Sequence, residues 1–382
     1  MSSTSSRSER LRGLTLVVAA ALLAVAAGLA AWWVQLSRGL GITGLSRDVS
    51  WGLYVSQFTF FVGVAASAVM VAVPYYLHNF KAFGRLMVFG EVLAIAALVM
   101  AGLFIVVDLG QPGRVLNVLL YPSPRSLMFW DMVSLGGYLA ISLMLAATAL
   151  LTEKRNLPAQ NWVRPLAYLS IPWAVSIHTV TAFLYAGLPG RPFWETAVLA
   201  PRFLASAFAS GPSLLLLIVL VTKDKPGFDT RPEAVRTLTS IIRYALAINL
   251  FLLGVEAFTA LYSQLPGEME AWRMAFLDPR VGVGLWMWVS TTFNLIAFGA
   301  LFVPAVRDQR RYLAFAAAMV VVAIWMEKGL GFIVAGFEPS PLGYVTRYFP
   351  TFLESTIVLG VWGVGVLILI VGLRLASTVR TA

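Results

Sequence analysis

Long apolar runs separated by short polar segments dominate the pattern along this chain. About 20 consecutive apolar residues are enough for one membrane-spanning helix, and ten runs reach that length. They cover residues 14–34, 50–77, 86–108, 127–151, 163–186, 202–222, 237–263, 281–304, 312–336 and 350–375. The pattern predicts an all-α, polytopic integral membrane protein with about ten transmembrane helices.

The order of the spans also predicts how the helices group. A charged segment between spans 6 and 7 divides the chain, so spans 2–5 and 6–9 are expected to form two four-helix bundles, with spans 1 and 10 at the periphery. The predicted units are 1–49 (tail, first span and outer loop), 50–190 (first bundle), 191–236 (outer loop, sixth span and cytoplasmic linker, starting the second bundle), 237–340 (rest of the second bundle) and 341–382 (last span and tail).

Composition narrows the class of protein. Hydrophobic residues make up 59% of the 382 and charged residues only 12%, against about 45–50% and about 25% in soluble domains. A soluble enzyme and a disordered chain are therefore excluded. The chain has no cysteine and only two histidines, His78 and His178. We expect no metal site, because thiolate zinc sites and iron–sulfur clusters need cysteine.

Basic residues predict the orientation. The N-terminal tail, the even-numbered loops and the C-terminal end hold about twice as many Lys and Arg as the odd-numbered loops, which places both termini in the cytoplasm. The net charge of +10 then reflects cytoplasmic loops rather than nucleic-acid binding. The first run permits a cleaved signal peptide, but its length favours an uncleaved anchor. We expect a bacterial inner (cytoplasmic) membrane protein.

Ionisable residues inside the spans are functional candidates, because charge is costly in a bilayer. They are Glu91, Asp108, Asp131, His178, Glu256, Glu327, Lys328 and Glu354. The topology places Asp108, Asp131 and His178 in the outer half of the first bundle, and Glu91 toward the cytoplasm.

Three further residues enter span 2 at the outer level: Trp51, Tyr54 and Gln57, spaced three apart as on one helix face. Together with the carboxylates and His178 they predict an aromatic, hydrogen-bonding and titratable pocket. A quinone needs these features, because its ring needs apolar walls and its two-electron reduction needs two protons. We therefore expect His178, Asp108 and Asp131 to be catalytic and, with the three span 2 residues, to bind quinone.

Simpler interpretations stand beside this one. The two aromatic residues of span 2 suit an aromatic belt. Asp108 and Asp131 suit helix caps or ion pairs with Arg114 and Arg125.

The remaining candidates also have simpler interpretations. Glu327 beside Lys328 suits a local charge pair, and His78 suits a solvated surface position. A bis-histidine haem is not expected, because helical rise places His78 and His178 about 20 Å apart in depth.

Several motifs carry a family resemblance. The segments DLGQPGR (108–114) and YPSPRSLMFW (121–130) resemble the outer loop typical of the NrfD family, which contains the polysulfide reductase membrane subunit. The segments at 51–54, 177–183, 190–194 and 200–203 resemble its ten-span branch in multisubunit respiratory complexes, closest to the membrane subunit of the Dsr sulfur-metabolism complex.

The resemblance implies a quinone-binding subunit without a redox metal of its own. Such a subunit passes electrons between menaquinone or ubiquinone and a periplasmic ferredoxin-like iron–sulfur protein, with coupled proton uptake or release, beside other membrane and cytochrome subunits. It implies docking at Arg114, Arg125 and Arg191, and a proton path that includes Glu91, Glu256 and Glu327.

Two other functions remain open from the residues. A secondary transporter, or an ion-translocating subunit without a redox role, predicts broken helices near the midplane, for which Pro172, Gly211-Pro212 and Gly254 are candidate bends. A passive membrane anchor predicts that the buried acids tolerate neutral substitution.

Overall fold

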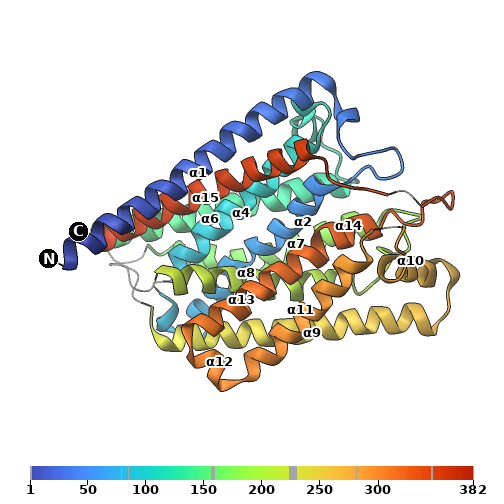
Figure 1. Ribbon diagram of the computed structural model, residues 1–382. Helices are drawn as coiled ribbons and strands as arrows, with labels where there is room; N and C mark the ends of the chain where they lie inside the picture. The colour runs from blue at the N-terminus through green and yellow to red at the C-terminus, as the bar shows by residue number, and fades with distance from the viewer. Residues whose placement is uncertain are drawn as a thin grey trace.

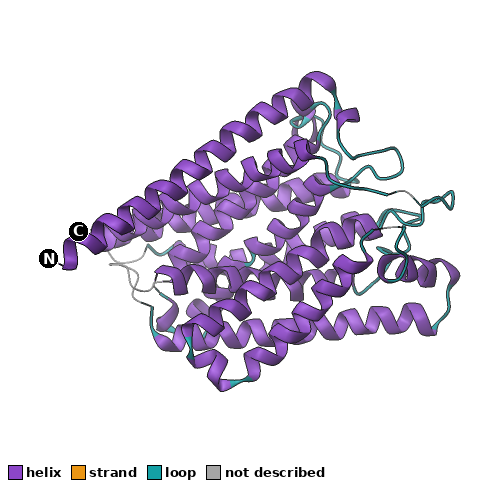
Figure 2. Cartoon of the chain, viewed as in Figure 1, coloured by secondary structure: helices purple, strands orange, loops and turns teal. Residues whose placement is uncertain are grey.

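Helices make up 80% of the computed structural model, which describes residues 2–78, 80–84, 86–155, 160–222, 230–280, 282–345 and 347–381. No strand occurs among these residues (Figure 2). Ten helical segments are long and apolar enough to cross a membrane, and each coincides with one of the ten runs predicted from the sequence. The predicted all-α membrane fold is confirmed.

The helices run α1 (Ser2–Arg38), α2 (Leu53–Ala65), α3 (Ser67–Ala72), α4 (Leu86–Asp108), α5 (Asn117–Leu120), α6 (Leu127–Arg155), α7 (Val163–Ala186), α8 (Leu199–Thr222), α9 (Pro232–Tyr262), α10 (Pro266–Phe276), α11 (Gly284–Phe302), α12 (Pro304–Asp308), α13 (Arg310–Met326), α14 (Phe332–Ala335) and α15 (Phe352–Thr381). Short 3₁₀-helices are η1 (Leu40–Ile42), η3 (Lys81–Phe83) and η4 (Pro112–Arg114). Two π-helices are η2 (Val73–Leu77) and η5 (Glu327–Gly331).

Two four-helix groups make up the body of the molecule. In the first, α2 contacts α4 and α7, and α6 contacts α4 and α7; in the second, α8 contacts α9 and α13, and α11 contacts α9 and α13. Of the outer pair, α15 lies along α4, and α1 packs on the outside of α15 (Figure 1). Gly28 and Gly360 let α1 and α15 approach closely, since a Cβ on Gly28 would lie 2.6 Å from the Gly360 Cα.

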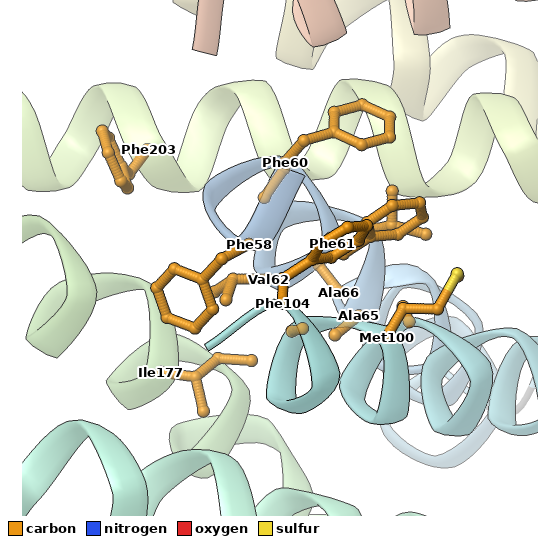
Figure 3. Close-up of a cluster of buried hydrophobic side chains, with 14 of the residues drawn as sticks. Phe58, Phe60, Phe61, Val62, Ala65, Ala66, Met100, Phe104, Ile177 and Phe203 are labelled. Atoms are coloured by element: carbon orange, nitrogen blue, oxygen red, sulfur yellow. The ribbon is translucent and has the colours of Figure 1, made fainter. Parts of the chain in front are cut away.

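The core is densest around α2, which is buried along its whole length. Figure 3 shows Phe58, Phe60 and Phe61 pointing to different sides of this helix. Phe61 stacks on Phe104 of α4 at 5.9 Å between ring centroids, and Gly63 and Ala207 meet at the contact between α2 and α8. Span 2 therefore joins the two bundles and fixes their relative position.

Spans 2 and 9 are interrupted. Span 2 changes from α2 to α3 at Ala66 and ends in the π-helix η2. Span 9 changes from α13 to η5 and α14, and Gly329 within η5 has non-helical dihedral angles (φ −81°, ψ −119°). At the bends considered from the sequence, at Pro172, Gly211-Pro212 and Gly254, helices α7, α8 and α9 continue instead.

Both termini lie at one end of the molecule, which we call the terminal end (Figure 1). The opposite, distal end carries the odd-numbered loops, 39–52, 109–126, 187–198, 263–283 and 336–351. Residues 223–229 of the predicted cytoplasmic linker lie outside the described residues.

Candidate functional site

An aromatic cluster at the distal end joins the two bundles. Trp51 stacks on Trp194, with ring centroids 5.9 Å apart and an interplanar angle of 29°. Tyr185 meets the edge of Trp51 at 5.7 Å and lies 5.3 Å from Trp194. Phe332 and Phe337 close the cluster from the second bundle. We call these five residues the distal aromatic cluster.

Local sequence explains why Trp194 can enter this cluster. The Trp194 indole N–H donates to the Phe332 carbonyl at 3.0 Å. A Cβ on Gly336 would lie 1.8 Å from the Trp194 ring, so only glycine leaves room for the indole at that position. Trp194 is fully buried as a result.

Two carboxylates lie near Tyr185. The Asp131 Oδ1 accepts a hydrogen bond from the Thr181 hydroxyl at 2.6 Å, and the Tyr185 and Thr59 hydroxyls lie 2.6 Å apart. Tyr185 is within electrostatic range of both Asp131 and Asp108. One Asp108 oxygen is buried without a hydrogen-bond partner. Both predicted carboxylates thus lie within electrostatic range of one tyrosine.

Tyr54 lies at the same end but faces α1 and α4. Its hydroxyl donates to Gln35 Oε1 at 2.6 Å, and the Gln35 amide donates to the Val107 carbonyl at 2.7 Å. Tyr54 is within electrostatic range of Asp108. It therefore connects the Asp108 end of α4 to the outer pair of helices.

The three span 2 candidates do not share one helix face. Trp51 precedes α2, which begins at Leu53. The Gln57 Oε1 accepts hydrogen bonds from Trp325 at 2.9 Å and from Trp362 at 3.1 Å. A buried indole N–H needs an acceptor, and Gln57 supplies one to both tryptophans. Gln57 thus links span 2 to spans 9 and 10, away from the distal aromatic cluster.

His178 is buried beneath the two carboxylates, three residues before Thr181 on α7. Neither ring nitrogen has a hydrogen-bond partner. Its ring lies 6.4 Å from that of Phe208 on α8 and within electrostatic range of Lys328. His178 therefore faces the seam between the bundles.

The second bundle buries an ion-pair network. Arg202 pairs with Glu256 and, at 2.7 Å, with Glu327. Asn294 donates to the other Glu327 oxygen at 2.9 Å. Lys328 instead donates to the Phe203 carbonyl at 2.8 Å and lies 3.9 Å above that ring. The interpretation of Glu327 and Lys328 as a local pair is wrong, because Arg202 is the ion-pair partner of Glu327.

Glu91 lies in a different environment. It is buried in α4 near Ser142 and Tyr138 of α6. The Glu91 Oε2 and the Tyr138 hydroxyl lack hydrogen-bond partners, and the Ser142 side chain lies close to the Glu91 carboxyl. A buried carboxyl oxygen and a neighbouring hydroxyl without partners are typical of a site occupied by water.

The described residues contain no group of three or more His, Cys, Asp or Glu side chains placed to hold a metal ion. The distal site offers hydrogen bonding, proton exchange at carboxyl oxygens and stacking on aromatic rings.

Comparison with known proteins decides the family. The model of the family "Polysulphide reductase, NrfD" matches residues 41–337. The chain belongs to the NrfD family.

Curated NrfD relatives align over nearly the whole chain. A protein of Halobacterium salinarum named as a dimethyl sulfoxide reductase membrane subunit is 28% identical over 93% of this chain and 89% of its own length. The Hdr-like menaquinol oxidoreductase integral membrane subunit of Archaeoglobus fulgidus is 25% identical, over 94% and 92%. A selenate reductase subunit of Mesobacillus selenatarsenatis is 23% identical, over 91% and 90%. Such relatives are membrane subunits of oxidoreductase complexes.

The NrfD loop at 109–126 presents an amphipathic surface. Arg114 and Arg125 are exposed, and so are Leu119, Leu120 and Tyr121 between them. Neither arginine forms an ion pair with Asp108 or Asp131 in the described part of the chain. We call residues 114–125 the distal basic–apolar loop.

Arg191 is placed differently from the other two predicted docking residues. It donates to the Phe337 carbonyl at 3.1 Å, and its guanidinium lies 4.4 Å above the Phe337 ring. Arg191 is half-buried and borders the distal aromatic cluster.

Several residues of the site were missed in the sequence. Tyr185 and Asn294 are uncharged and stand in no recognisable pattern, and Trp194 was recognised only as part of the segment 190–194. Arg202 was expected at the membrane edge because span 6 was predicted to begin there. Proline favours the first turn of a helix, so Pro201 was a signal that α8 begins earlier and that Arg202 lies inside the membrane.

Proposed function

We propose that this NrfD protein is the quinone-reactive membrane subunit of an oxidoreductase complex. It passes electrons between membrane quinol and an iron–sulfur subunit that docks at the distal end. The observation that supports the proposal is that Asp108 and Asp131 both lie within electrostatic range of Tyr185, whose ring packs against those of Trp51 and Trp194.

The residues present fit a quinone. The half-buried Trp51 offers an apolar ring backed by Trp194, and Asp131 with Thr181 offers a hydrogen-bonded carboxyl. The partnerless oxygen of Asp108 can accept a hydrogen bond or take up a proton. The quinone supplies the two-electron chemistry, and these side chains orient its ring and exchange protons at carboxyl oxygens. His178, one turn deeper, would relay a proton away from Asp131.

Menaquinone is the quinone we favour over ubiquinone. The names of two relatives support this choice: the menaquinol oxidoreductase subunit of Archaeoglobus fulgidus and a menaquinone reductase integral membrane subunit of Nitratidesulfovibrio vulgaris, 22% identical over 89% of this chain. Membership of the Dsr branch and a role in sulfur metabolism stay predictions.

We propose that the distal end faces the periplasm, with both termini in the cytoplasm and the chain in the inner membrane. The distal basic–apolar loop offers Arg114 and Arg125 to an acidic, ferredoxin-like protein, around an apolar centre. Charge of opposite sign steers such encounters and apolar contact stabilises them. Cytochrome and further membrane subunits would complete the complex.

Among the three proton-path candidates, Glu91 is the best placed. Its partnerless oxygen and the neighbouring Tyr138 hydroxyl can hold water, and it lies on the terminal half of α4, about 25 Å along the helix from Asp108 by helical rise. Glu256 and Glu327 are held in the Arg202 network, which favours fixed charges there, although Glu256 keeps one oxygen without a partner.

The test is quinol turnover by the purified complex carrying His178→Ala, Asp108→Asn or Asp131→Asn. Each variant is expected to lose activity while the complex still assembles, because each change removes a proton-exchanging group without removing a buried ion pair. Leu375→Ala, an exposed position on α15, serves as the control. Normal turnover in all three variants would refute the quinone site.

A second candidate function rests on the break in span 9. Gly329 interrupts the helix beside Lys328 and Glu327, and broken helices beside buried charge are typical of ion and substrate sites in transporters. An ion-translocating role without redox chemistry predicts ion uptake by proteoliposomes that contain this chain alone. The quinone proposal predicts none.

A further inference from the structure

A lateral crevice lies outside the proposed quinone site, between α15 and the second bundle. Its volume is about 490 Å³, within the range of about 300–1,000 Å³ that is typical of ligand pockets. Leu53 of α2, Leu330 of η5 and side chains from α11, α13, α14 and α15 line it, and the loop at 348–350 covers its distal end. In Figure 1, α15 is red and α11 is orange. The walls include Val283, Trp286, Trp325, Val358 and Leu359.

The two indoles of the lining have no free donor. The Trp286 N–H donates to the Met326 carbonyl at 2.8 Å, and the Trp325 N–H donates to Gln57 at 2.9 Å. Their rings therefore offer only apolar surface to the crevice.

The other two polar side chains of the lining are also engaged. The Tyr348 hydroxyl donates to Glu354 at 2.7 Å and accepts from the Leu53 N–H at 2.8 Å. The Ser355 hydroxyl donates to the Thr351 carbonyl at 3.0 Å. A quinone ring or another polar group in the crevice would find no unpaired side-chain donor, so its occupant is hydrocarbon.

The mouth of the crevice carries positive charge. The Arg347 Nε donates to the Arg280 carbonyl at 3.0 Å, and this bond joins the two loops whose residues Gly282 and Phe349 form one edge of the crevice. Arg347 is exposed and lies within electrostatic range of Asp278, which pairs with Arg280, so the two arginines outnumber the one carboxylate. Phe349 and Leu359 at the same opening are exposed, so the crevice opens toward the membrane at the distal end.

We propose that this crevice binds one acyl chain of an anionic phospholipid, with its phosphate at Arg347. Apolar walls without free donors select a hydrocarbon chain, and a guanidinium binds phosphate by charge-assisted hydrogen bonds. The surrounding leaflet supplies both parts in one molecule. A bound chain also supports Tyr348, whose hydroxyl holds the first N–H of α2.

The experiment uses the full chain in phosphatidylcholine nanodiscs that contain a phosphatidylglycerol with a photoreactive group in its acyl chain. After illumination, mass spectrometry maps the labelled residues. We expect labels at 282–286, 325–334 and 355–359. Arg347→Gln should lower this labelling about tenfold, because it removes one charge-assisted contact with the phosphate. The control is Arg374→Gln at the terminal end of α15, an exposed position. It should leave the labelling unchanged.

Leu359→Trp fills the crevice from its open side and should abolish the labels there. The matched control is Leu375→Trp, because the two leucines are similarly exposed on the same helix, at 61% and 53%. Thermal unfolding with added phosphatidylglycerol gives a second readout, with a stabilising shift expected in the native chain and not in Arg347→Gln.

Three results would overturn the proposal. They are the absence of label in the crevice, equal labelling by photoreactive phosphatidylcholine, and stronger labelling of the same residues by a photoreactive menaquinone, which would assign the crevice to a quinone tail.

Discussion

The two four-helix bundles bury their ionisable groups in different ways. In the first bundle, Asp131 is bonded to a neutral hydroxyl, and Asp108, Glu91 and His178 keep atoms without partners. In the second bundle, Arg202 bridges two carboxylates and Asn294 supports one of them.

This contrast separates two uses of buried charge. A carboxyl with neutral partners can gain or lose a proton without breaking an ion pair, so the first bundle suits proton-coupled chemistry. An arginine between two carboxylates ties them into one ion-pair network, and removing one member leaves the other charges uncompensated. The ion-pair network of the second bundle therefore suits a structural role, in which it holds span 9 in place where its helix is interrupted.

The largest expected effect follows from removing the centre of the network. Arg202→Met should destabilise the protein by about 3–5 kcal/mol, because Glu256 and Glu327 lose their counter-charge. Thermal unfolding and the yield of assembled protein measure this loss. Adding Glu256→Gln and Glu327→Gln should restore much of it. Native stability in Arg202→Met alone would show that the network does not hold the second bundle together.

The next largest effects are expected from replacing one acid in each bundle by its neutral amide. Asp131→Asn keeps an acceptor for the Thr181 hydroxyl but removes the exchangeable proton, so quinol turnover should fall about 10²–10⁴-fold with unfolding nearly unchanged. Glu327→Gln should have the opposite effect: it should lower the stability of the protein and leave quinol turnover nearly unchanged. Steady-state turnover and a melting curve on both variants give the comparison. Equal effects of the two variants on both quantities would remove the distinction.

Gln57 was expected at the quinone site. Its hydrogen bonds with two indoles predict a structural role instead. Gln57→Leu leaves the N–H groups of Trp325 and Trp362 without an acceptor, which costs about 1–3 kcal/mol for a buried group. The affinity for quinone should stay the same. Gln57→Glu, which keeps an acceptor oxygen, is the control. Loss of quinone binding in Gln57→Leu without loss of stability would return this residue to the site.

The smallest structural effect is expected at the distal basic–apolar loop. Arg114→Glu lies on the surface, so stability should change by less than about 0.5 kcal/mol. Binding of the iron–sulfur partner should weaken, and it should become less sensitive to salt because a rim charge acts mainly on encounter. Binding kinetics at two ionic strengths test this, with Arg311→Glu at the terminal end as control.

The fold could be predicted closely because membrane solvation leaves few alternatives. Each span must satisfy its own backbone hydrogen bonds. The length of the apolar runs and the polar segments between them were therefore enough to locate all ten helices. The break in span 9 could not be found this way, since Gly329 looks like any other glycine and its effect depends on the contacts around it.

The site could be predicted only in part. Depth along a span placed Asp108 and Asp131 at the same level, and the structure brings both near Tyr185. Rotation about the helix axis was not available from spacing alone, so the direction of Gln57 toward Trp325 and Trp362 was missed. Arg202 shows the third limit: span 6 was predicted to begin three residues too late, which put a buried ion-pair partner at the edge of the span.

The most direct measurement is photoaffinity labelling of the assembled complex with an azido-menaquinone, followed by peptide mapping. If the distal site of the first bundle binds quinone, labels fall on residues 51–54, 127–131 and 181–194, and Asp131→Asn or excess menaquinone reduces them. Labels confined to α9, α11 and α13 of the second bundle, unaffected by Asp131→Asn, would contradict the assignment.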